Sequence, residues 1–521
     1  MVQNSVAGLD DYVTGKNTDF SKVGVKAVDD HTLQYTLAQP ESFWNSKLTT
    51  STMMPVNEKF LKSAGKDFGS VKPSGILYNG PYYLKSFTSK SLMEFTKNEN
   101  YYDKDNVKID DIKLTYFDGS DQDYLARNFS DGNLTTARLF PTSSTFSTIE
   151  KKFKDNIVYS PQDATVYYVY FNVNRQNYGH TEKTTDDQKN QTKTALQNKN
   201  FRQAINFALD RTSLSAQSNG KDGASKTLRT LLVPPTFVQV DNKDFGSVVE
   251  EKLAATGDDW KDVSLADAQD SMFNADKAKA QFAKAKEALQ AEGVQFPIHL
   301  DVPVNQSNKI FVNQVQSLKQ SIESALGKDN VVLDLHQLST DDFYNITYSA
   351  SNAAAEDWDL SVGVAWEPDY LDPSTYLDVL KTTNSENTKS FMGYDDPNSQ
   401  AVEKVGLKEY DQLVDDASKE TTDLTARYEK YAKAQAWLTD SALYIPTTTY
   451  NGAAAVVSRI KPFSGAYAQA GDKGSTYYFK YLKSQDDIVT KKQYDSAYKD
   501  WLKERAKSND KAQKDLVKHV K

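Results

Sequence analysis

Residues 274–304 read NADKAKAQFAKAKEALQAEGVQFPIHLDVPV and join a helical pattern to a strand pattern. The first apolar positions recur every three or four residues, at Ala278, Phe282, Ala285 and Leu289. The later ones alternate with other residues, at Ile298, Leu300, Val302 and Val304. The first spacing predicts an amphipathic helix that is capped by Asn274 and followed by Gly293, and the second predicts a strand.

The alternation of helix and strand continues downstream of this stretch. A second helix is predicted from one apolar face, formed by Phe311, Val315, Leu318, Ile322 and Ala325. A strand over 331–335, a short helix from Thr340 and a strand over 358–366 follow. Helices that alternate with strands in this way predict an α/β fold, with a βαβ-type sheet covered by helices. His299 and His336 fall on these strands, where we expect hydrogen-bonded structural histidines.

The flanking regions carry other patterns. Strands are predicted in the hairpin of residues 23–37 and over 82–87, 91–96, 109–117 and 166–173. A long helix is predicted over 421–440, followed by a β-prone stretch over 442–450. The tail from residue 491 to 521 has a helical pattern and many charges, so we expect a surface helix there.

Composition limits the class of protein. The chain has 521 residues, enough for two or three domains. Its 62 basic and 71 acidic side chains give a net charge of −9, and no basic stripe is evident, so a nucleic-acid partner is not expected. The absence of cysteine excludes disulfides, thiolate metal sites and a lipid-bearing cysteine in the chain as given. No apolar run reaches the roughly 18 residues that a membrane-spanning helix needs.

Motifs for catalysis, metals and cofactors are missing. The five histidines are far apart in the sequence, and none lies in a zinc-binding pattern. There is neither a GxxxxGK[ST] phosphate loop nor a GxSxG nucleophile turn. We therefore expect no enzymatic activity, no metal and no cofactor, and any ATP would be hydrolysed by a separate subunit.

The most unusual segment, AWEPDYLDPSTYL at 365–377, follows the last strand of the predicted βαβ unit. Ligands of open α/β sheets bind beyond the carboxyl ends of strands, so a site is expected here. Trp366 and Tyr370 offer flat apolar walls, and Asp369 offers a carboxylate suited to an ammonium group. Two other interpretations remain open: a purely structural loop, or a glycoside hydrolase that uses Glu367, Asp369 and Asp372 as its acids.

Several stretches resemble oligopeptide-binding proteins, the extracytoplasmic receptors of ABC peptide importers. WEPDYLDPSTYLD at 366–378 is similar to the family's GWxxDYxDPxxxL stretch. YNGPYYLKSF at 78–87, NFRQAINFALDR at 200–211 and ALYIPTTTYN at 442–451 resemble three further family motifs, in the family's order. The segment 23–56 is similar to the family's early hairpin. The resemblance covers most of the chain and is nearest to the peptide-binding lipoproteins of Gram-positive bacteria such as streptococci.

The resemblance implies a two-lobed fold of the periplasmic-binding-protein type II class, with two hinge segments and a peptide enclosed between the lobes. Asp369 would pair with the peptide's α-ammonium, Trp366 and Tyr370 would line the cleft, and Tyr450 would lie beside the hinge strand. Glu367 would add negative charge and favour basic peptides. The partners would be oligopeptides and the permease and ATPase subunits of an importer, and the protein would be monomeric. A peptide-sensing or adhesive surface protein of the same ancestry is the alternative.

The resemblance also implies a division of the chain. Residues 1–72 would be a remnant of the small extra lobe, 73–199 the first part of lobe I, 200–450 lobe III, and 451–521 the return to lobe I with C-terminal helices. Family members begin with a signal peptide and a lipidated cysteine and are held at the outer face of the membrane. The chain as given starts just before the early hairpin, so we expect most of the small lobe to be missing, with lower stability and weaker peptide binding as a result.

Overall fold

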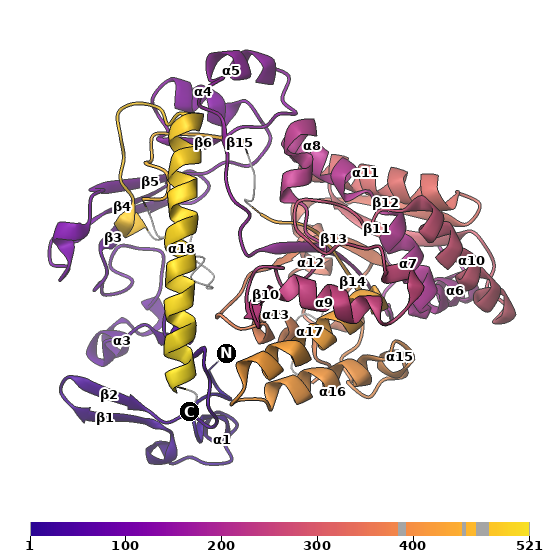
Figure 1. Ribbon diagram of the computed structural model, residues 1–521, viewed down its shortest axis with the longest axis horizontal. Coiled ribbons are helices and arrows are strands. Elements are labelled where there is room, and N and C mark those ends of the chain that lie inside the picture. Colours follow the sequence, from indigo (N-terminus) through magenta and orange to yellow (C-terminus); the bar gives the residue numbers. More distant parts are fainter. Residues whose placement is uncertain (1, 384–391, 451–454, 465–478, 520–521) are drawn as a thin grey trace.

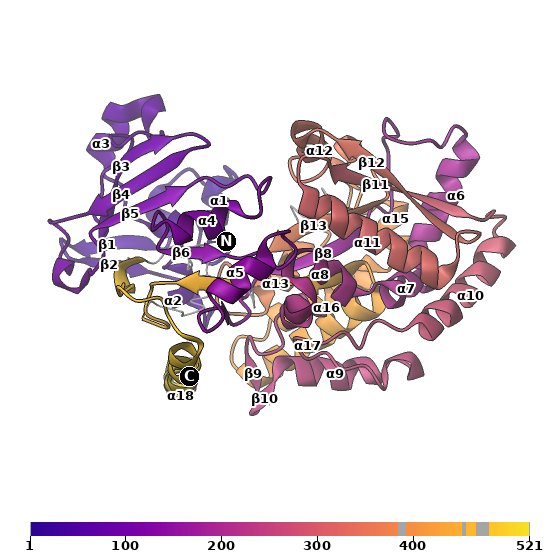
Figure 2. The same ribbon diagram turned by 90° about the horizontal axis from the view of Figure 1, so that it is seen from above.

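Two hydrophobic cores divide the chain into two lobes, which lie side by side in the computed structural model (Figures 1 and 2). The structure describes residues 2–383, 392–450, 455–464 and 479–519. We call residues 2–159 and 455–519 the first lobe, and residues 166–450 the second lobe. The larger core lies entirely in the second lobe, from Val166 to Ile445. The smaller core joins residues 126–159 to Ala455, Val457 and Ile488.

Short antiparallel sheets build the first lobe. The predicted early hairpin is confirmed as β1 (Val25–Asp29) and β2 (Thr32–Tyr35). The predicted strands that follow form a second sheet of β3 (Tyr82–Thr88), β4 (Leu92–Lys97) and β5 (Asp111–Thr115). A third sheet places β15 (Ala455–Ser458) between β6 (Thr136–Arg138) and β7 (Val158–Tyr159). Besides the C-terminal helix, the described α-helices of this lobe are α1 (Leu9–Val13), α2 (Trp44–Lys47), α3 (Glu58–Ala64), α4 (Tyr124–Ser130) and α5 (Phe146–Lys152).

The charged tail forms one long helix, α18 (Lys491–His519), as predicted. Both views place it alongside the first lobe (Figures 1 and 2). Aromatic rings attach the start of α18 to the rest of the lobe. Phe463 stacks on Tyr498 and Trp501, with ring centroids 5.6 and 5.4 Å away. Stacked aromatic rings combine a large buried area with favourable electrostatics, so this cluster fixes the start of a helix that is otherwise rich in charge.

The helix and strand predicted from residues 274–304 are confirmed. In α10 (Ala275–Ala291), the side chain of Asn274 accepts hydrogen bonds from the backbone N–H groups of Asp276 and Lys277. The strands β11 (Ile298–Asn305) and β12 (Val331–Leu338) pair in parallel, with α11 (Lys309–Leu326) between them in the chain. A βαβ unit is therefore present, and α12 (Thr340–Ile346) follows it.

The third predicted strand of this unit, β13 (Leu360–Trp366), does not join the parallel sheet. It pairs antiparallel with β8 (Val166–Phe171), and β14 (Tyr444–Thr448) pairs antiparallel with the other edge of β8. The strand β8 is almost wholly buried and apolar, so it needs hydrogen-bonding partners on both edges. Periodicity identified β13 as a strand, but the strand that it pairs with lies far upstream in the sequence.

A network of buried ions joins β11 to the loops around it. The guanidinium of Arg175 contacts Asp301, Asp357 and Asp359, and the ammonium of Lys183 contacts Asp301 and Asp359. His336 lies 2.8 Å from Asp301, and His299 lies 2.8 Å from Asp334. Both histidines therefore have the hydrogen-bonded structural role that the sequence predicted.

Buried arginines attach the helix pair α7 (Lys199–Ala208) and α8 (Arg211–Ala224) to the strand that returns to the first lobe. Arg202 Nε donates to the carbonyl of Ser441, just before β14. Arg211 Nε donates to the carbonyl of Pro446 within β14, and its Nη1 pairs with Asp270. In the described part of the second lobe, the remaining helices of four or more residues are α6 (Asp186–Gln197), α9 (Phe245–Ala254), α13 (Ser374–Leu377), α15 (Gln400–Lys404), α16 (Leu407–Ser418) and α17 (Leu424–Ser441).

Two segments connect the lobes. The first runs from β7 to β8, and the second runs from β14 to β15 through residues 451–454, which lie outside the described part of the chain. The sequence placed a boundary between residues 199 and 200, but Ala195 and Leu196 of α6 already belong to the larger core, as does β8. We therefore propose that the boundary lies between β7 and β8.

Candidate functional site

A cavity of about 410 Å³ lies between the two lobes. The first lobe contributes Gly119, Arg138 and Phe140 to its wall. The second lobe contributes residues from β8, α8, β11, α11, α12, β13 and β14. Because both lobes and the ends of the connecting strands form its wall, the cavity changes shape whenever the lobes move relative to one another.

The wall of the cavity combines aromatic rings with neutral hydrogen-bonding groups. The aromatic residues are Phe140, Tyr167, Phe311, Phe343, Tyr344 and Tyr450. The amide and hydroxyl residues are Ser218, Asn219, Asn305, Asn308, Gln314, Thr447, Thr448 and Thr449. Flat apolar faces beside a few polar groups are typical of ligand sites, and this mixture suits a ligand with both main-chain amides and apolar side chains.

Two β-bulges present backbone to this cavity. The pairing of β13 with β8 shifts between Val362 and Val364, and the pairing of β14 with β8 shifts between Pro446 and Thr448. The residues between, Gly363 and Thr447, both line the cavity. Gly363 has a φ of 92°, and a Cβ there would lie 2.9 Å from the ring of Phe311, so glycine is required. A bulged residue leaves backbone groups outside the ladder, and at the exposed Gly363 a ligand can reach them. Thr447 is buried, and its carbonyl accepts a hydrogen bond from the backbone N–H of Arg229.

Arg138 is the only charged side chain among the described residues of the cavity wall. It lies on β6, opposite Val456 of β15. Its Nη2 donates to Asn219 Oδ1 across the two lobes at 3.3 Å, and its guanidinium lies over the ring of Phe140 with 5.1 Å to the centroid. Burial lowers the pKa of Arg138, while Tyr450 and Tyr167 act in the opposite direction.

Tyr450 is the one predicted site residue that lines the cavity. It follows β14, its side chain is 51% exposed, and its ring centroid lies 6.2 Å from that of Tyr167. Burial is the main cause of the raised pKa of Tyr167, so its hydroxyl remains a neutral hydrogen-bonding group at physiological pH. The two rings lie near the ends of β8 and β14, next to the segments that connect the lobes.

The other four predicted site residues lie around the carboxyl end of β13, outside the wall of this cavity. Trp366 is the last residue of the strand and pairs with Val166. Glu367 Oε1 accepts a 2.8 Å hydrogen bond from Thr165 Oγ1. Asp369 is half-buried, and its backbone N–H donates to Thr375 Oγ1 at 2.8 Å. The loop thus lies next to the first connecting segment and is held to it through Glu367.

Tyr370 makes a contact between the lobes that sequence reasoning did not predict. Its ring stacks on that of Phe43 in the first lobe, and the ammonium of Lys47 lies over both rings, 4.8 Å from Phe43 and 4.6 Å from Tyr370. The backbone N–H of Leu371 donates to Ser46 Oγ at 3.0 Å. The predicted ligand loop therefore touches the first lobe directly, at the segment around α2.

A buried ion pair fixes the same loop to α17. Arg427 of α17 donates through Nε and Nη2 to the two carboxylate oxygens of Asp372, at 3.0 and 2.9 Å. Both side chains are buried, and this bidentate geometry is the strongest form of the interaction. Asp372 is therefore occupied as a structural anchor, which argues against the hydrolase interpretation that needed it as an acid.

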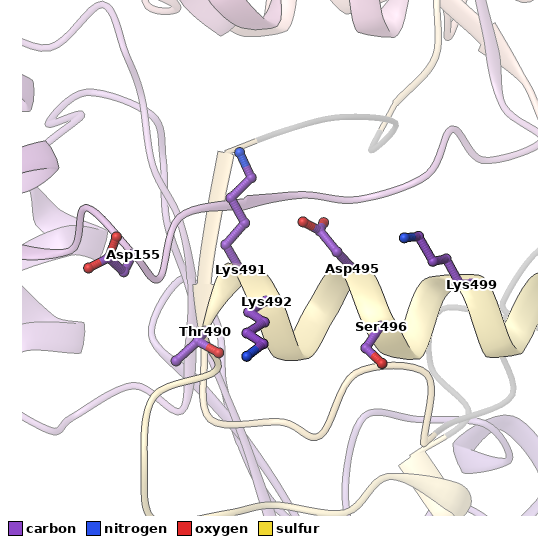
Figure 3. Close-up of a pocket in the computed structure, with 7 residues that line it drawn as sticks. All are labelled: Asp155, Thr490, Lys491, Lys492, Asp495, Ser496 and Lys499. Atoms are coloured by element: carbon purple, nitrogen blue, oxygen red, sulfur yellow. The ribbon is translucent and has the colours of Figure 1, made fainter.

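A second hollow of about 590 Å³ lies on the outside of the first lobe, at the start of α18. Figure 3 shows Lys491 and Lys499 on one side of the helix with Asp495 between them, and Lys492 on the other side. The lysines do not converge on one point and an acid lies between two of them, so we do not assign a ligand to this surface. Among the described helices, none has the length and apolar character that crossing a membrane requires.

Most of the chain matches a known protein family. Residues 4–388 match the family described as "Bacterial extracellular solute-binding proteins, family 5 Middle". The chain belongs to this family. Its members are solute-binding proteins, so the prediction that the chain is not an enzyme is confirmed, as is the predicted fold class.

Streptococcal relatives cover the whole chain. The family member "Oligopeptide-binding protein AmiA" of Streptococcus pneumoniae is 60% identical over 522 residues, and "Oligopeptide-binding protein SarA" of Streptococcus gordonii is 61% identical over 523 residues. In each case the match spans 100% of this chain and 79% of the relative. The predicted resemblance to streptococcal oligopeptide-binding proteins is therefore confirmed.

Solved structures of more distant family members share the fold. The substrate-binding domain of an oligopeptide ABC transporter from Bacillus anthracis aligns with a TM-score of 0.66 at 22% identity, over 92% of this chain and 79% of that one. Listeria monocytogenes OppA bound to peptide aligns with a TM-score of 0.64 at 22% identity, over 93% of this chain and 79% of that one.

Proposed function

We propose that this chain captures oligopeptides between its two lobes and delivers them to the permease of an ABC importer, driven by separate ATPase subunits. The observation that carries the proposal is the interlobe cavity, whose aromatic and amide wall is built by both lobes and by the connecting strands. The relatives that are about 60% identical bear the name oligopeptide-binding protein. We also propose that the protein acts as a monomer at the outer face of the cell membrane.

The backbone at the Gly363 bulge supplies sequence-tolerant affinity. An extended peptide offers one N–H and one C=O per residue, and these groups can pair with the exposed main chain at Gly363. The amide side chains of the wall and bridging water accept different peptide side chains without leaving polar groups unpaired. Such a site binds peptides in general and does not select one peptide sequence.

Next to this cavity, at the carboxyl end of β13, we propose that Asp369 holds the peptide's α-ammonium, with Trp366 and Tyr370 as apolar walls. Tyr450, in the cavity wall, would stack on the peptide near the hinge. Support comes from the position of the loop at the carboxyl end of β13, the strand whose middle lines the cavity. A carboxylate in a half-buried loop gains from a charge-assisted hydrogen bond to an ammonium group. Glu367 contributes to the loop through its bond to Thr165.

Mass spectrometry of the denatured protein tests the function directly. We expect co-purified oligopeptides to be released, and peptide-free refolded protein to bind a mixed peptide pool with a saturable heat signal in calorimetry. Asp369→Asn should weaken binding of peptides with a free amino terminus and leave binding of N-acetylated ones unchanged. A protein that releases no peptide and binds none from the pool would refute the proposal. Peptide uptake by cells that carry or lack the gene separates import from sensing.

A further inference from the structure

Arg138 has an unpaired donor beside a mostly neutral cavity. Its Nε is buried and makes no hydrogen bond to any described residue. One other donor, at Nη2, is used by Asn219. A guanidinium has five N–H donors in a rigid fork, and the bond to Asn219 uses one of them. Arg138 as a whole is half-buried and lines the cavity. The unpaired Nε costs free energy in its buried position, and an acceptor that pairs with the guanidinium would recover part of this cost.

The charge of Arg138 is also left without a counter-ion. Among the described residues, no carboxylate lies within ion-pair distance of its guanidinium, and the described cavity wall contains no acid. The neighbours that do face it are the ring of Phe140, the amide of Asn219 and the two phenols of Tyr167 and Tyr450. Arginine stays protonated inside proteins, so the cavity carries one net positive charge.

We propose that Arg138 binds a carboxylate of the captured peptide, either its C-terminal carboxylate or the side chain of an aspartate or glutamate. This inference rests on the proposed function and names the chemical class that the site prefers. The fork of the guanidinium matches the two oxygens of a carboxylate in a bidentate pair, which a lysine could not reproduce. Asn219 holds one arm of the fork from the opposite lobe, so the carboxylate binds where the two lobes meet.

The proposed preference for peptides with a carboxylate is opposite to the preference for basic peptides that was expected from the sequence. Glu367 led to the expectation that basic peptides are favoured, but it hydrogen-bonds to Thr165 and does not line the cavity. The charge that does line the cavity is positive. With an ammonium at Asp369 and a carboxylate at Arg138, the two ends of the site also give the bound peptide a fixed direction.

A random heptapeptide library, made in free-acid and C-terminally amidated forms, tests this inference. Peptides retained by the refolded protein are released by denaturation and quantified by mass spectrometry. We expect the free-acid form, or the amidated peptides that contain Asp or Glu, to be retained about tenfold or more over amidated neutral peptides, as for one hydrogen-bonded charge pair. Enrichment of the free-acid form alone identifies the C-terminal carboxylate as the group that Arg138 binds. Enrichment of acidic amidated peptides identifies an aspartate or glutamate side chain as that group.

Two variants connect this preference to Arg138. Arg138→Gln keeps a hydrogen-bonding group for Asn219 but removes the charge, so the enrichment should disappear while neutral peptides are still retained. Asn219→Asp keeps Arg138 but supplies a carboxylate beside it, and should reduce the enrichment in the same way. Retention of peptides with no charge preference in the unmodified protein, or an unchanged preference in Arg138→Gln, would overturn the inference and leave the proposed function intact. Retention of no peptide at all overturns both.

Discussion

The ring of Tyr370 in the second lobe stacks on the ring of Phe43 in the first lobe, with centroids 4.9 Å apart and ring planes at 17°. This contact joins the loop proposed to hold the peptide's amino terminus to the segment around α2, and Lys47 lies over both rings. We therefore expect closure of the lobes and formation of the proposed ammonium site to be linked through this aromatic pair.

Removal of this stack should favour the open arrangement of the lobes. Phe43→Ala removes an aromatic pair worth about 0.5–1.5 kcal/mol, so peptide affinity should fall roughly two- to tenfold. Calorimetry with a peptide pool measures the affinity, and small-angle X-ray scattering should show a larger radius of gyration. The control is Tyr102→Ala, because Tyr102 is 88% exposed. Unchanged affinity and radius in Phe43→Ala would show that the stack does not contribute to closure.

Breaking the buried pair of Asp372 and Arg427 should destabilise the second lobe. Asp372→Asn leaves a buried guanidinium without its counter-ion, a change that typically costs about 3–5 kcal/mol. Replacing both residues, as Asp372→Leu with Arg427→Met, should recover much of this loss because neither charge then remains buried. Urea unfolding measures both variants. Glu58→Gln breaks the exposed pair of Glu58 with Lys62 and should change stability by less than about 1 kcal/mol.

Glu356 should make stability depend on pH. Its side chain is fully buried, and burial raises its pKa to about 10 despite a hydrogen bond from the backbone N–H of Gly393. The folded state therefore holds a proton that the unfolded state releases above about pH 4.5. The contribution is fully present below that pH and is lost as pH rises toward 10.

Glu356→Gln replaces the protonated carboxyl with a neutral group of the same shape. The variant should be more stable than the parent protein at pH 8, by on the order of a few kcal/mol, and the two should be nearly equal at pH 4.5. Urea unfolding at both pH values provides the comparison. A parent protein whose stability has the same pH slope as the variant would contradict the proposed protonation state.

Gly220 allows α8 to approach the first lobe. It has a φ of 63°, and a Cβ there would lie 2.5 Å from Cβ of Pro141. Gly220→Ala should lower stability by about 1 kcal/mol from backbone strain and, in addition, weaken peptide binding by holding the lobes apart. Gly132→Ala is the matched control, since its φ is 80° and nothing lies within 4 Å of the added carbon. Equal peptide affinities for the two variants would show that the approach at Pro141 plays no part in closure.

Local patterns allowed much of the second lobe to be predicted. The capped helix α10, the strands β11 and β12 and the helix between them follow from spacings of three, four and two residues, which are properties of neighbouring positions. The pairing of β13 could not be predicted in this way. Its partner β8 lies far upstream in the sequence. Pairing with β8 or with the parallel sheet of β11 and β12 would bury the same apolar face of β13.

The site was predicted only in part for the same reason. The unusual composition of the loop at 365–377 identified it as a candidate site, and Tyr450, which was predicted to lie beside a hinge, lines the interlobe cavity. Phe43 and Arg138 escaped notice because their importance comes from residues far away in the sequence. The only local signal for Arg138 is a lone basic residue between Ala137 and Leu139 in a three-residue strand.

The strand β8 has a mechanical consequence. It enters the second lobe from the first connecting segment, and it pairs with β14, which leads into the second connecting segment. It also pairs with β13, whose middle lines the cavity. The strands next to both connecting segments and part of the cavity wall thus belong to one three-stranded sheet. If the lobes separate by bending this sheet, we expect the cavity wall to change shape at the same time, so that opening and release of a bound peptide would be coupled.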